Sequence, residues 1–153
     1  MTPEPATVHR MFYRSRATAA AEADLDSVVD QIMNSSIFNN YTVGLTGLLL
    51  VVKGHFIQVL EGETNALRST YARISLDRRH RDLQIIAQGT AERRLFGEWT
   101  MCARTLKPSD RLIVDSLGGR EDFNPKELSA ASVERLLLNV ATLQRRSLPA
   151  EYI

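Results

Sequence analysis

The chain has 153 residues, enough for one domain of ordinary size with a short extension but too few for a second full domain. Its 19 basic and 18 acidic residues leave a net charge of +1, which excludes a global attraction to nucleic acid or anionic membranes. An internal disulfide is excluded because Cys102 is the only cysteine, and the N-terminus lacks the apolar run of a signal peptide. We therefore expect a soluble, cytoplasmic protein.

The first predicted elements are a strand and a helix. Val8–Tyr13 reads as a strand, and a helix beginning at about Asp24 carries apolar residues at helical spacing, with Ile32 on its inward face. Asn39 and Asn40 follow the last predicted turn. If the helix persists beyond them, Asn40 stays close to the inward face.

A hairpin should come next. Leu45–Val52 (LTGLLLVV) is too apolar to have a face in water, which predicts a central strand covered by a helix on one or both sides. Lys53-Gly54 is a short turn into the strand Phe56–Leu60. Gln58 interrupts this second strand between apolar neighbours, and a buried amide without a partner costs roughly 1–3 kcal/mol. Some group should therefore hydrogen-bond to Gln58.

A second helix and two more strands complete the sheet. The helix follows Gly62, carries Ile74 on its inward face and ends in the charged run at 77–81. Leu83–Gln88 and Trp99–Arg104 read as strands. The order β-α-β-β-α-β-β predicts an α+β fold, a ferredoxin-like sheet with two helices on one face.

The remaining residues predict a helical extension. We place the domain boundary after residue 106, with residues 107–153 as the extension. A short helix is expected over Pro108–Leu117 and a longer one, with an apolar stripe, over Pro125–Gln144. The longer helix can cap the open face of the sheet or form a surface for a dimer or another partner, and the two roles are compatible.

Polar side chains from three segments need a common explanation: Tyr13, Asn39 with Asn40, and Gln58. In a ferredoxin-like arrangement the two helices lie side by side over one sheet face, and a planar ligand could lie between them. An inward isoleucine on each helix would contact its two faces, while the amides would address its polar edge. Flat apolar walls with a few placed amides suit an aromatic heterocycle such as flavin.

These residues stand in stretches that resemble the BLUF domains, blue-light sensors that use flavin. The matching stretches are HRMFYRSRAT, FNNYTVGLTGLLL, HFIQVLEG, RISLDRRHRDLQII and ERRLFGEWTM, which follow the family's order and spacing from about Val8 to Leu106. The resemblance implies a blue-light photoreceptor with a non-covalently bound flavin. FAD is the usual cofactor in the family, and FMN or riboflavin is possible because all three share the ring that the matched residues address.

The resemblance also implies a role for each matched residue. Tyr13 would donate an electron and then a proton to the photoexcited flavin, and Gln58 would rearrange to give a reversible red-shifted state. An amide suits this role because it both donates and accepts hydrogen bonds. The cofactor-binding residues that the family implies are Ile32, Asn39, Asn40, Gln58, Arg73, Ile74, Asp77, Arg79 and His80.

Trp99 and Met101 should share one face of the last predicted strand. They are either core packing or, as the family implies, the residues that pass the signal to the C-terminal helices. The sequence leaves open which of them lies nearer the flavin. Cys102 should point to the opposite face as a small core residue.

Other classes of function find less support. The aromatic pattern of RNA-binding sheets is missing, and His9, His55 and His80 have no metal-ligand spacing. No Gly-rich phosphate loop of the Walker or Rossmann type is present. Only 47 residues follow Leu106, so we expect a stand-alone sensor without catalysis and without a metal. Its output would be contact with an unknown partner protein or with itself as a homodimer or higher oligomer. A flavin protein for storage or redox chemistry remains an alternative, although Tyr13 with Gln58 argues against it.

Overall fold

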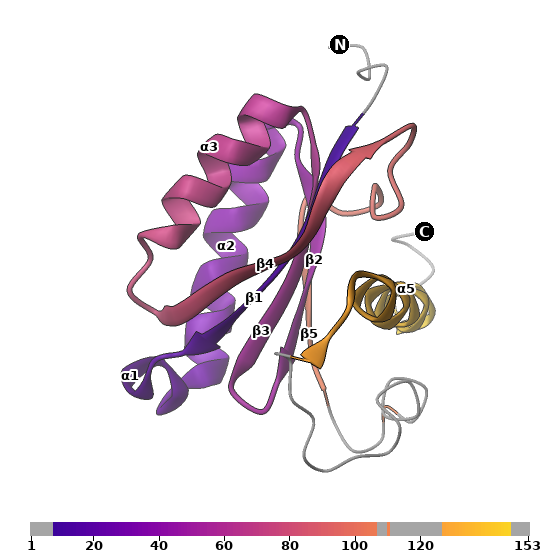
Figure 1. Cartoon of the computed structure of the whole chain (residues 1–153). Coiled ribbons are helices and arrows are strands. Elements are labelled where there is room, and N and C mark those ends of the chain that lie inside the picture. Colours follow the sequence, from indigo (N-terminus) through magenta and orange to yellow (C-terminus); the bar gives the residue numbers. More distant parts are fainter. Residues whose placement is uncertain (1–7, 107–109, 111–126, 148–153) are drawn as a thin grey trace.

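The computed structural model describes residues 8–106, 110 and 127–147 (Figure 1). Within these ranges the elements are β1 (Val8–Ala17), α1 (Ala19–Glu22), α2 (Leu25–Val43), β2 (Thr46–Val52), β3 (His55–Gly62), α3 (Thr64–Ser75), β4 (His80–Ala91), β5 (Cys102–Thr105) and α5 (Ala130–Ser147). The predicted short helix at Pro108–Leu117 lies outside the described residues except for Asp110, as does the predicted start of the longer helix at Pro125.

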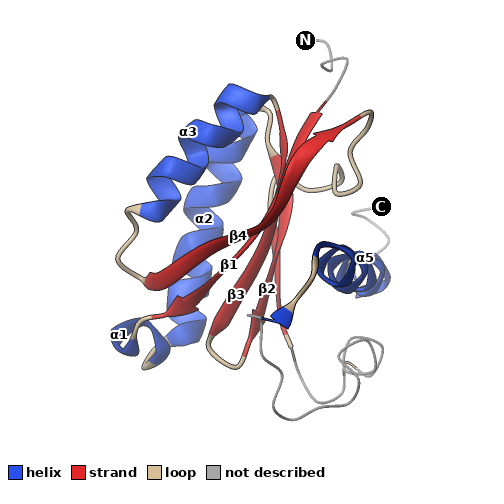
Figure 2. Cartoon of the chain, in the orientation of Figure 1, coloured by secondary structure: helices blue, strands red, loops and turns tan. Residues whose placement is uncertain are grey.

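One five-stranded sheet, in the order β4-β1-β3-β2-β5, organises the fold. β3 pairs antiparallel with both β1 and β2, β4 pairs antiparallel with β1, and β5 pairs in parallel with β2. Two β-α-β units, β1-α2-β2 and β3-α3-β4, are therefore interleaved. This arrangement places α2 and α3 side by side on one face of the sheet and α5 on the other (Figures 1 and 2). The predicted α+β, ferredoxin-like fold with a C-terminal helix is confirmed.

The apolar strand β2 is covered on both faces. Leu48 and Leu50 are fully buried in the core on the α5 side, whereas Leu49 and Val51 are buried in the core on the α2 and α3 side. This is the alternation expected of a strand, whose successive side chains point to opposite faces. Helix α5 therefore caps the sheet face that α2 and α3 leave open, and its residues Val133, Leu136, Leu137, Val140 and Ala141 are buried against that face.

The turn between β2 and β3 shows why a glycine follows Lys53. Both residues have positive φ, 49° at Lys53 and 77° at Gly54. Type I′ turns need positive φ at both central positions, and their twist matches that of the two strands. The turn thus sets the register in which Leu49 faces Gln58 on β3.

Helix α2 is longer than predicted. It continues to Val43, so Asn39 and Asn40 lie inside its last two turns rather than after it. The end comes at Gly44, whose left-handed φ of 72° lets its N–H reach the carbonyl oxygens of Asn40 and Tyr41. Asn40 consequently stays on the inward face of the helix and is only 2% exposed.

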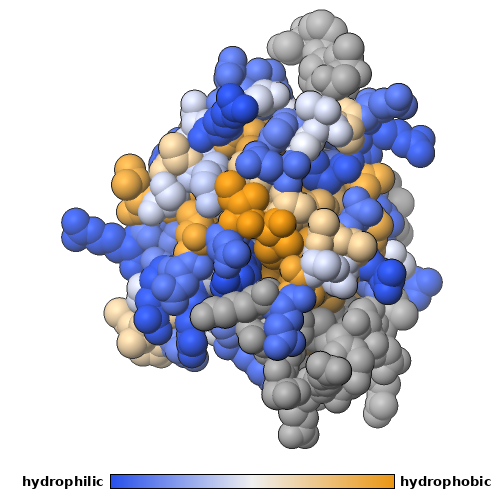
Figure 3. Space-filling view, in the orientation of Figure 1, coloured by the Kyte–Doolittle hydropathy of each residue, from blue (hydrophilic) through white to orange (hydrophobic). Residues whose placement is uncertain are grey.

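Two strands also extend beyond the predicted limits. β1 runs on past Tyr13 because its polar residues Ser15 and Arg16 pair in register with Phe56 and His55 of β3. β4, predicted from Leu83, already begins at His80, and it is an edge strand whose residues are either exposed or only partly buried. Figure 3 shows hydrophobic residues gathered near the middle of the view, where β4 passes, with hydrophilic residues around them.

Gly47 on β2 lies so close to β3 and Met101 that a substitution there tests how tightly these elements pack. A Cβ atom there would overlap the carbonyl oxygen of Val59 and lie 3.2 Å from the Met101 methyl carbon. Overpacking of this kind typically costs about 1–3 kcal/mol, so Gly47→Ala should lower the free energy of unfolding by about that amount. Gly89→Ala is the matched control, because a Cβ at Gly89 meets nothing within 4 Å. Denaturant titrations measure both variants, and equal stability of the two would contradict the packing.

Candidate functional site

A cavity lies between α2, α3 and the sheet. It encloses about 810 Å³, part of it open to solvent. Its floor comes from the strands, its two walls from the helices, and its far end from the segment between α3 and β4. Ten predicted site residues line it: Tyr13, Ile32, Asn39, Asn40, Gln58, Arg73, Ile74, Asp77, Arg79 and His80.

Further lining residues were not predicted. Leu49, Phe56 and Leu60 are apolar residues of the floor. Other side chains that sequence reasoning missed are small and hydroxylic: Ser15, Ser35, Ser36 and Thr70. Helical spacing was the available signal for those on the helices, since Ser35 lies one turn before Asn39 and Thr70 one turn before Ile74.

Tyr13 is a buried phenol at the floor of the cavity. It is 2% exposed, and its hydroxyl has no hydrogen-bond partner among the described residues. Its ring meets that of Tyr71 edge to face, with the centroids 5.4 Å apart. Burial, and secondarily the neighbouring Tyr71, raises the pKa of Tyr13 well above the usual value for a phenol. The phenol is therefore neutral at physiological pH, and it lines the cavity without a hydrogen-bond partner among the described residues.

Gln58 stands opposite Tyr13 in the antiparallel pairing of β1 and β3. The side chain is 7% exposed, and its amide nitrogen donates to the sulfur of Met101 at 3.3 Å. Both residues project from the same face of the sheet because directly paired strand residues share a face. The structure thus brings a buried amide and a buried phenol together on adjacent strands.

Asn40 contacts the same downstream segment as Gln58. Its side-chain nitrogen donates to the carbonyl oxygen of Thr100 at 2.8 Å, and Thr100 immediately precedes Met101. Asn39, one residue earlier on α2, is half-buried and also lines the cavity. The side-chain amides of Asn40 and Gln58 therefore bind two consecutive residues, Thr100 and Met101.

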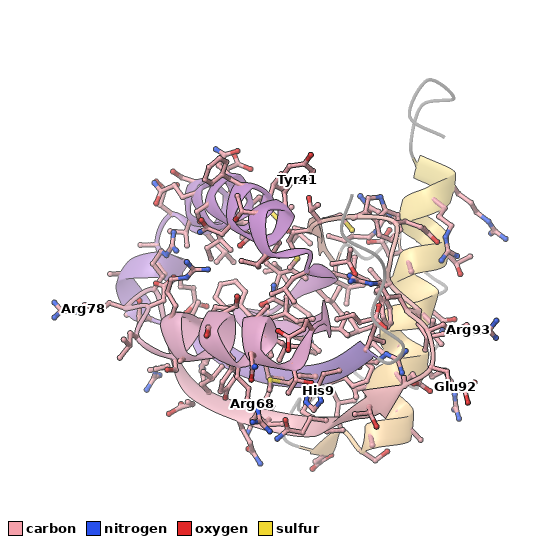
Figure 4. The ribbon with its side chains drawn as sticks, turned by 90° about the horizontal axis from the view of Figure 1, so that it is seen from above. His9, Tyr41, Arg68, Arg78, Glu92 and Arg93 are labelled. Atoms are coloured by element: carbon pink, nitrogen blue, oxygen red, sulfur yellow. The ribbon has the colours of Figure 1, made fainter. Side chains whose placement is uncertain are left out.

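A charged cluster forms the other end of the cavity. The two carboxylate oxygens of Asp77 share the Nε–H of Arg79, at 2.9 and 3.0 Å, and Asp77 forms an ion pair with the guanidinium. The hydrogen bonds from Arg79 lower the pKa of Asp77. In Figure 4 the intervening Arg78 points away from the interior. The charged run predicted at the helix end is thus divided between the cavity and the surface.

His80 is held by two hydrogen bonds at this end. Its Nε2 atom lies 2.7 Å from the Ile74 carbonyl oxygen, and its Nδ1 atom lies 2.8 Å from the Ser15 hydroxyl. Because a carbonyl only accepts, Nε2 carries a hydrogen, and in the neutral ring Nδ1 accepts from Ser15. His80 therefore joins β1 to the end of α3.

Trp99 and Met101 do not share a face, and the prediction that they do was wrong. β5 begins only at Cys102, which pairs with Leu48 of β2. The Trp99 carbonyl still accepts from the Gly47 N–H on β2, but the Thr100 carbonyl accepts from Asn40 on α2. Met101 is 4% exposed in the core on the cavity side, whereas Trp99 packs against the core on the α5 side. Met101 is thus the residue nearer the cavity.

Cys102 is a buried core residue, as predicted, and it lies on the α5 side, opposite to Met101 but in the same core as Trp99, so the prediction that it faces away from both residues is only half right. Burial, with a smaller effect from the charge of Glu98, raises the pKa of its thiol to about 12. A thiol with such a pKa stays protonated and unreactive at neutral pH. We assign it a packing role only.

The donor set of the cavity fits a planar heterocycle. Ile32 and Ile74 come from opposite walls, and amides from both a helix and a strand reach the cavity together with the unpartnered hydroxyl of Tyr13. Apolar walls with a few convergent polar groups are typical of cofactor sites. Fold and cavity together define a sheet protein whose cavity between two helices suits a flat, polar-edged ligand.

Comparison with known proteins identifies the family. Residues 8–102 match the BLUF family, described as sensors of blue-light using FAD, and the chain belongs to this family. BLUF domains bind flavin. The family assignment that the five sequence stretches indicated is confirmed.

Solved structures and curated relatives agree with this assignment. The dark state of BlrB, a BLUF protein, superposes with a TM-score of 0.72 at 29% identity, covering 88% of this chain and 98% of that one. BlrP1 of Klebsiella pneumoniae, with FMN and cyclic diGMP, gives a TM-score of 0.59 at 30% identity, covering 93% of this chain and 37% of that one.

The photoactivated adenylate cyclase subunit alpha of Euglena gracilis is 31% identical over 94 residues, which are 61% of this chain and 9% of that protein. The match therefore spans about a tenth of the length of the curated relatives. Among the described helices, none is long and apolar enough to cross a membrane.

The raised pKa of Tyr13 predicts a loss of stability at alkaline pH. An unfolded tyrosine ionises at a pH of about 10, whereas buried Tyr13 keeps its proton, so the folded chain binds more protons above that pH. This contribution to stability is complete below a pH of about 10 and is lost as the pH rises toward the folded pKa. The free energy of unfolding should therefore fall more steeply above that pH in the parent protein than in Tyr13→Phe.

Tyr41→Phe is the control for this titration, because Tyr41 is 76% exposed and points away from the interior in Figure 4. Its curve should parallel that of the parent protein. Identical alkaline slopes for all three proteins would show that Tyr13 ionises as freely in the fold as in the unfolded chain.

Proposed function

We propose that this chain is a blue-light photoreceptor that binds a flavin non-covalently in the cavity between α2 and α3. One observation carries the proposal: the unpartnered phenol of Tyr13 stands beside the amide of Gln58 at the floor of a cavity with isoleucine walls. A simple flavin carrier needs the walls and the amides. It does not need a buried phenol next to an exchangeable amide.

The lining residues divide into groups that suit the parts of a flavin. Ile32 and Ile74 would contact the faces of the ring, and Asn39, Asn40 and Gln58 its polar edge. Arg73 and Asp77 would lie near the ring's C2 carbonyl and the ribityl chain, with Arg79 and His80 close to the phosphate. We propose FAD, after the family description, while the FMN in the BlrP1 structure supports FMN as a second candidate.

The bound flavin supplies the absorption of blue light and, when excited, an electron acceptor. Tyr13 would give up an electron and then its phenolic proton. Its raised pKa means that the neutral phenol is the donor, so no prior ionisation is required. Gln58 would then exchange its donor and acceptor ends, and the electron and the proton would return to Tyr13, so that only the hydrogen bond at the flavin edge is altered, with almost no change of shape. The altered bond shifts the absorption reversibly to the red.

The readout would be a change of contacts between proteins. Gln58 and Asn40 bind the segment that carries Met101 in the cavity-side core and Trp99 in the core beneath α5. A rearrangement of Gln58 would therefore be felt on both faces of the sheet. We propose a cytoplasmic sensor without its own catalysis, which signals through a partner protein or a second copy of itself.

The spectrum of the purified, flavin-loaded protein before and after blue light tests this proposal. The flavin bands should move to the red and return in the dark. Tyr13→Phe should bind flavin and show no red shift, because a benzyl side chain has no phenolic proton and is far harder to oxidise. Tyr41→Phe should behave as the parent protein. A yellow parent protein that never shifts would favour the storage or redox alternative, and one that never binds flavin would refute both.

Gln58→Leu tests the role of the amide independently of the role of the Tyr13 phenol. Leucine has a similar volume and no hydrogen-bonding groups, so the protein should fold and bind flavin while losing the reversible red shift. Absorption spectra in the dark and in the light measure this, and flavin fluorescence checks binding. A normal photocycle in the variant would remove the amide from the mechanism.

A further inference from the structure

The segment of residues 92–101, which we call the connecting segment, joins β4 to β5 without forming a helix or strand. It ends at Met101, the hydrogen-bond partner of Gln58. An irregular segment has no ladder of its own to define its path. Whatever holds the connecting segment therefore decides where the Met101 sulfur lies.

Glu61 holds this segment through a buried carboxylate. The residue is 0% exposed, and its side chain accepts from the backbone N–H groups of Leu95 at 2.8 Å and Phe96 at 2.6 Å. Arg10 on β1 donates to the same carboxylate at 2.7 Å. Three donors on one buried carboxylate, one of them charged, make a strong anchor.

Neighbouring contacts reinforce the anchor. Arg94 donates to the backbone carbonyl oxygen of Glu61 at 3.2 Å and to that of Gly44 at 2.8 Å. Phe96 is fully buried, with its ring edge to face against Phe12 at a centroid distance of 6.2 Å. By contrast, Glu92 and Arg93 at the start of the segment point away from the molecule in Figure 4. The middle of the segment is thus fixed while its beginning is at the surface.

Glu61 and Gln58 lie three residues apart on β3, so their side chains project from opposite faces of the sheet. One strand therefore grips the connecting segment at two points, Phe96 on the α5 side and Met101 on the cavity side. We propose that Glu61 is a positioning residue that holds Met101 against Gln58. This inference rests on the proposed photocycle, in which the Gln58 amide rearranges.

Glu61→Gln tests the anchor with little change of shape. Glutamine accepts at only one end of its amide, so either orientation places an NH₂ group against a donor that now binds the carboxylate. Glu92→Gln is the matched control, since it makes the same change of charge on the same segment at an exposed position. In Glu61→Gln the Leu95 and Phe96 amides should exchange faster with solvent, and the Met101 methyl resonance should shift. In Glu92→Gln both should stay as in the parent protein.

The photocycle supplies a second readout. Loss of one hydrogen bond typically changes a rate by a few-fold, so Glu61→Gln should alter the dark recovery of the flavin bands by about threefold or more. Met101→Ala should change recovery in the same direction. The double variant should recover at the rate of Met101→Ala alone, because Glu61 acts through Met101. Independent, multiplicative effects, or an unchanged recovery in Glu61→Gln, would overturn the proposal.

The outcomes distinguish this inference from the proposed function. A parent protein without a red shift would refute the photocycle, while amide exchange and the Met101 resonance would still test whether Glu61 positions the segment. If Glu61→Gln does not fold, amide hydrogen exchange in the parent protein tests whether Glu61 anchors the connecting segment. The Leu95 and Phe96 amides should then be the slowest of the connecting segment and be unaffected by light. Uniform exchange along the segment would overturn the anchor.

Discussion

The antiparallel pairing of β1 with β3 is the constraint on which the rest of the structure depends. It sets Tyr13 opposite Gln58, and both are polar groups in a sheet that is covered by helices on both faces. Burial of such groups is costly unless they are hydrogen-bonded. The cost is tolerable because the two side chains open onto one cavity and because Met101 takes part of the hydrogen bonding of Gln58.

Cover on both faces places the cavity-side core and the α5-side core on the two sides of one sheet. Side chains alternate along every strand, so each strand contributes to the cavity-side core and to the α5-side core at once. The stretch from Trp99 to Met101 crosses from one core to the other within three residues. On β3, the side chains of Glu61 and Gln58 likewise point to opposite faces of the sheet. The coupling between the cavity and α5 that we propose would therefore run through the sheet itself and would need no separate hinge.

Much of this was predictable from the sequence. Hydrophobic periodicity indicated the helices α2, α3 and α5, the β2-β3 hairpin and the fold class, since these depend on local patterns of period 3.6 and 2. Ten of the residues now found around the cavity could be named from short motifs in a fixed order, whereas the apolar floor and the small hydroxylic residues could not. The prediction for Trp99 and Met101 failed for a non-local reason: the Thr100 carbonyl between them accepts from Asn40, 60 residues away, and Trp99 packs on the other face.

The sequence by itself determined the elements, the apolar alternation of β2 and the presence of an amide where a strand should be apolar, because these follow from the order of neighbouring residues. Only the tertiary structure decided that Tyr13 lies opposite Gln58, that Met101 rather than Trp99 faces the cavity, and that the Glu61 carboxylate holds the Leu95 and Phe96 amides. Each of these depends on strand register and on a hydrogen bond between residues distant in the chain. Such pairings are set by the packing of the whole sheet, and no local pattern encodes them.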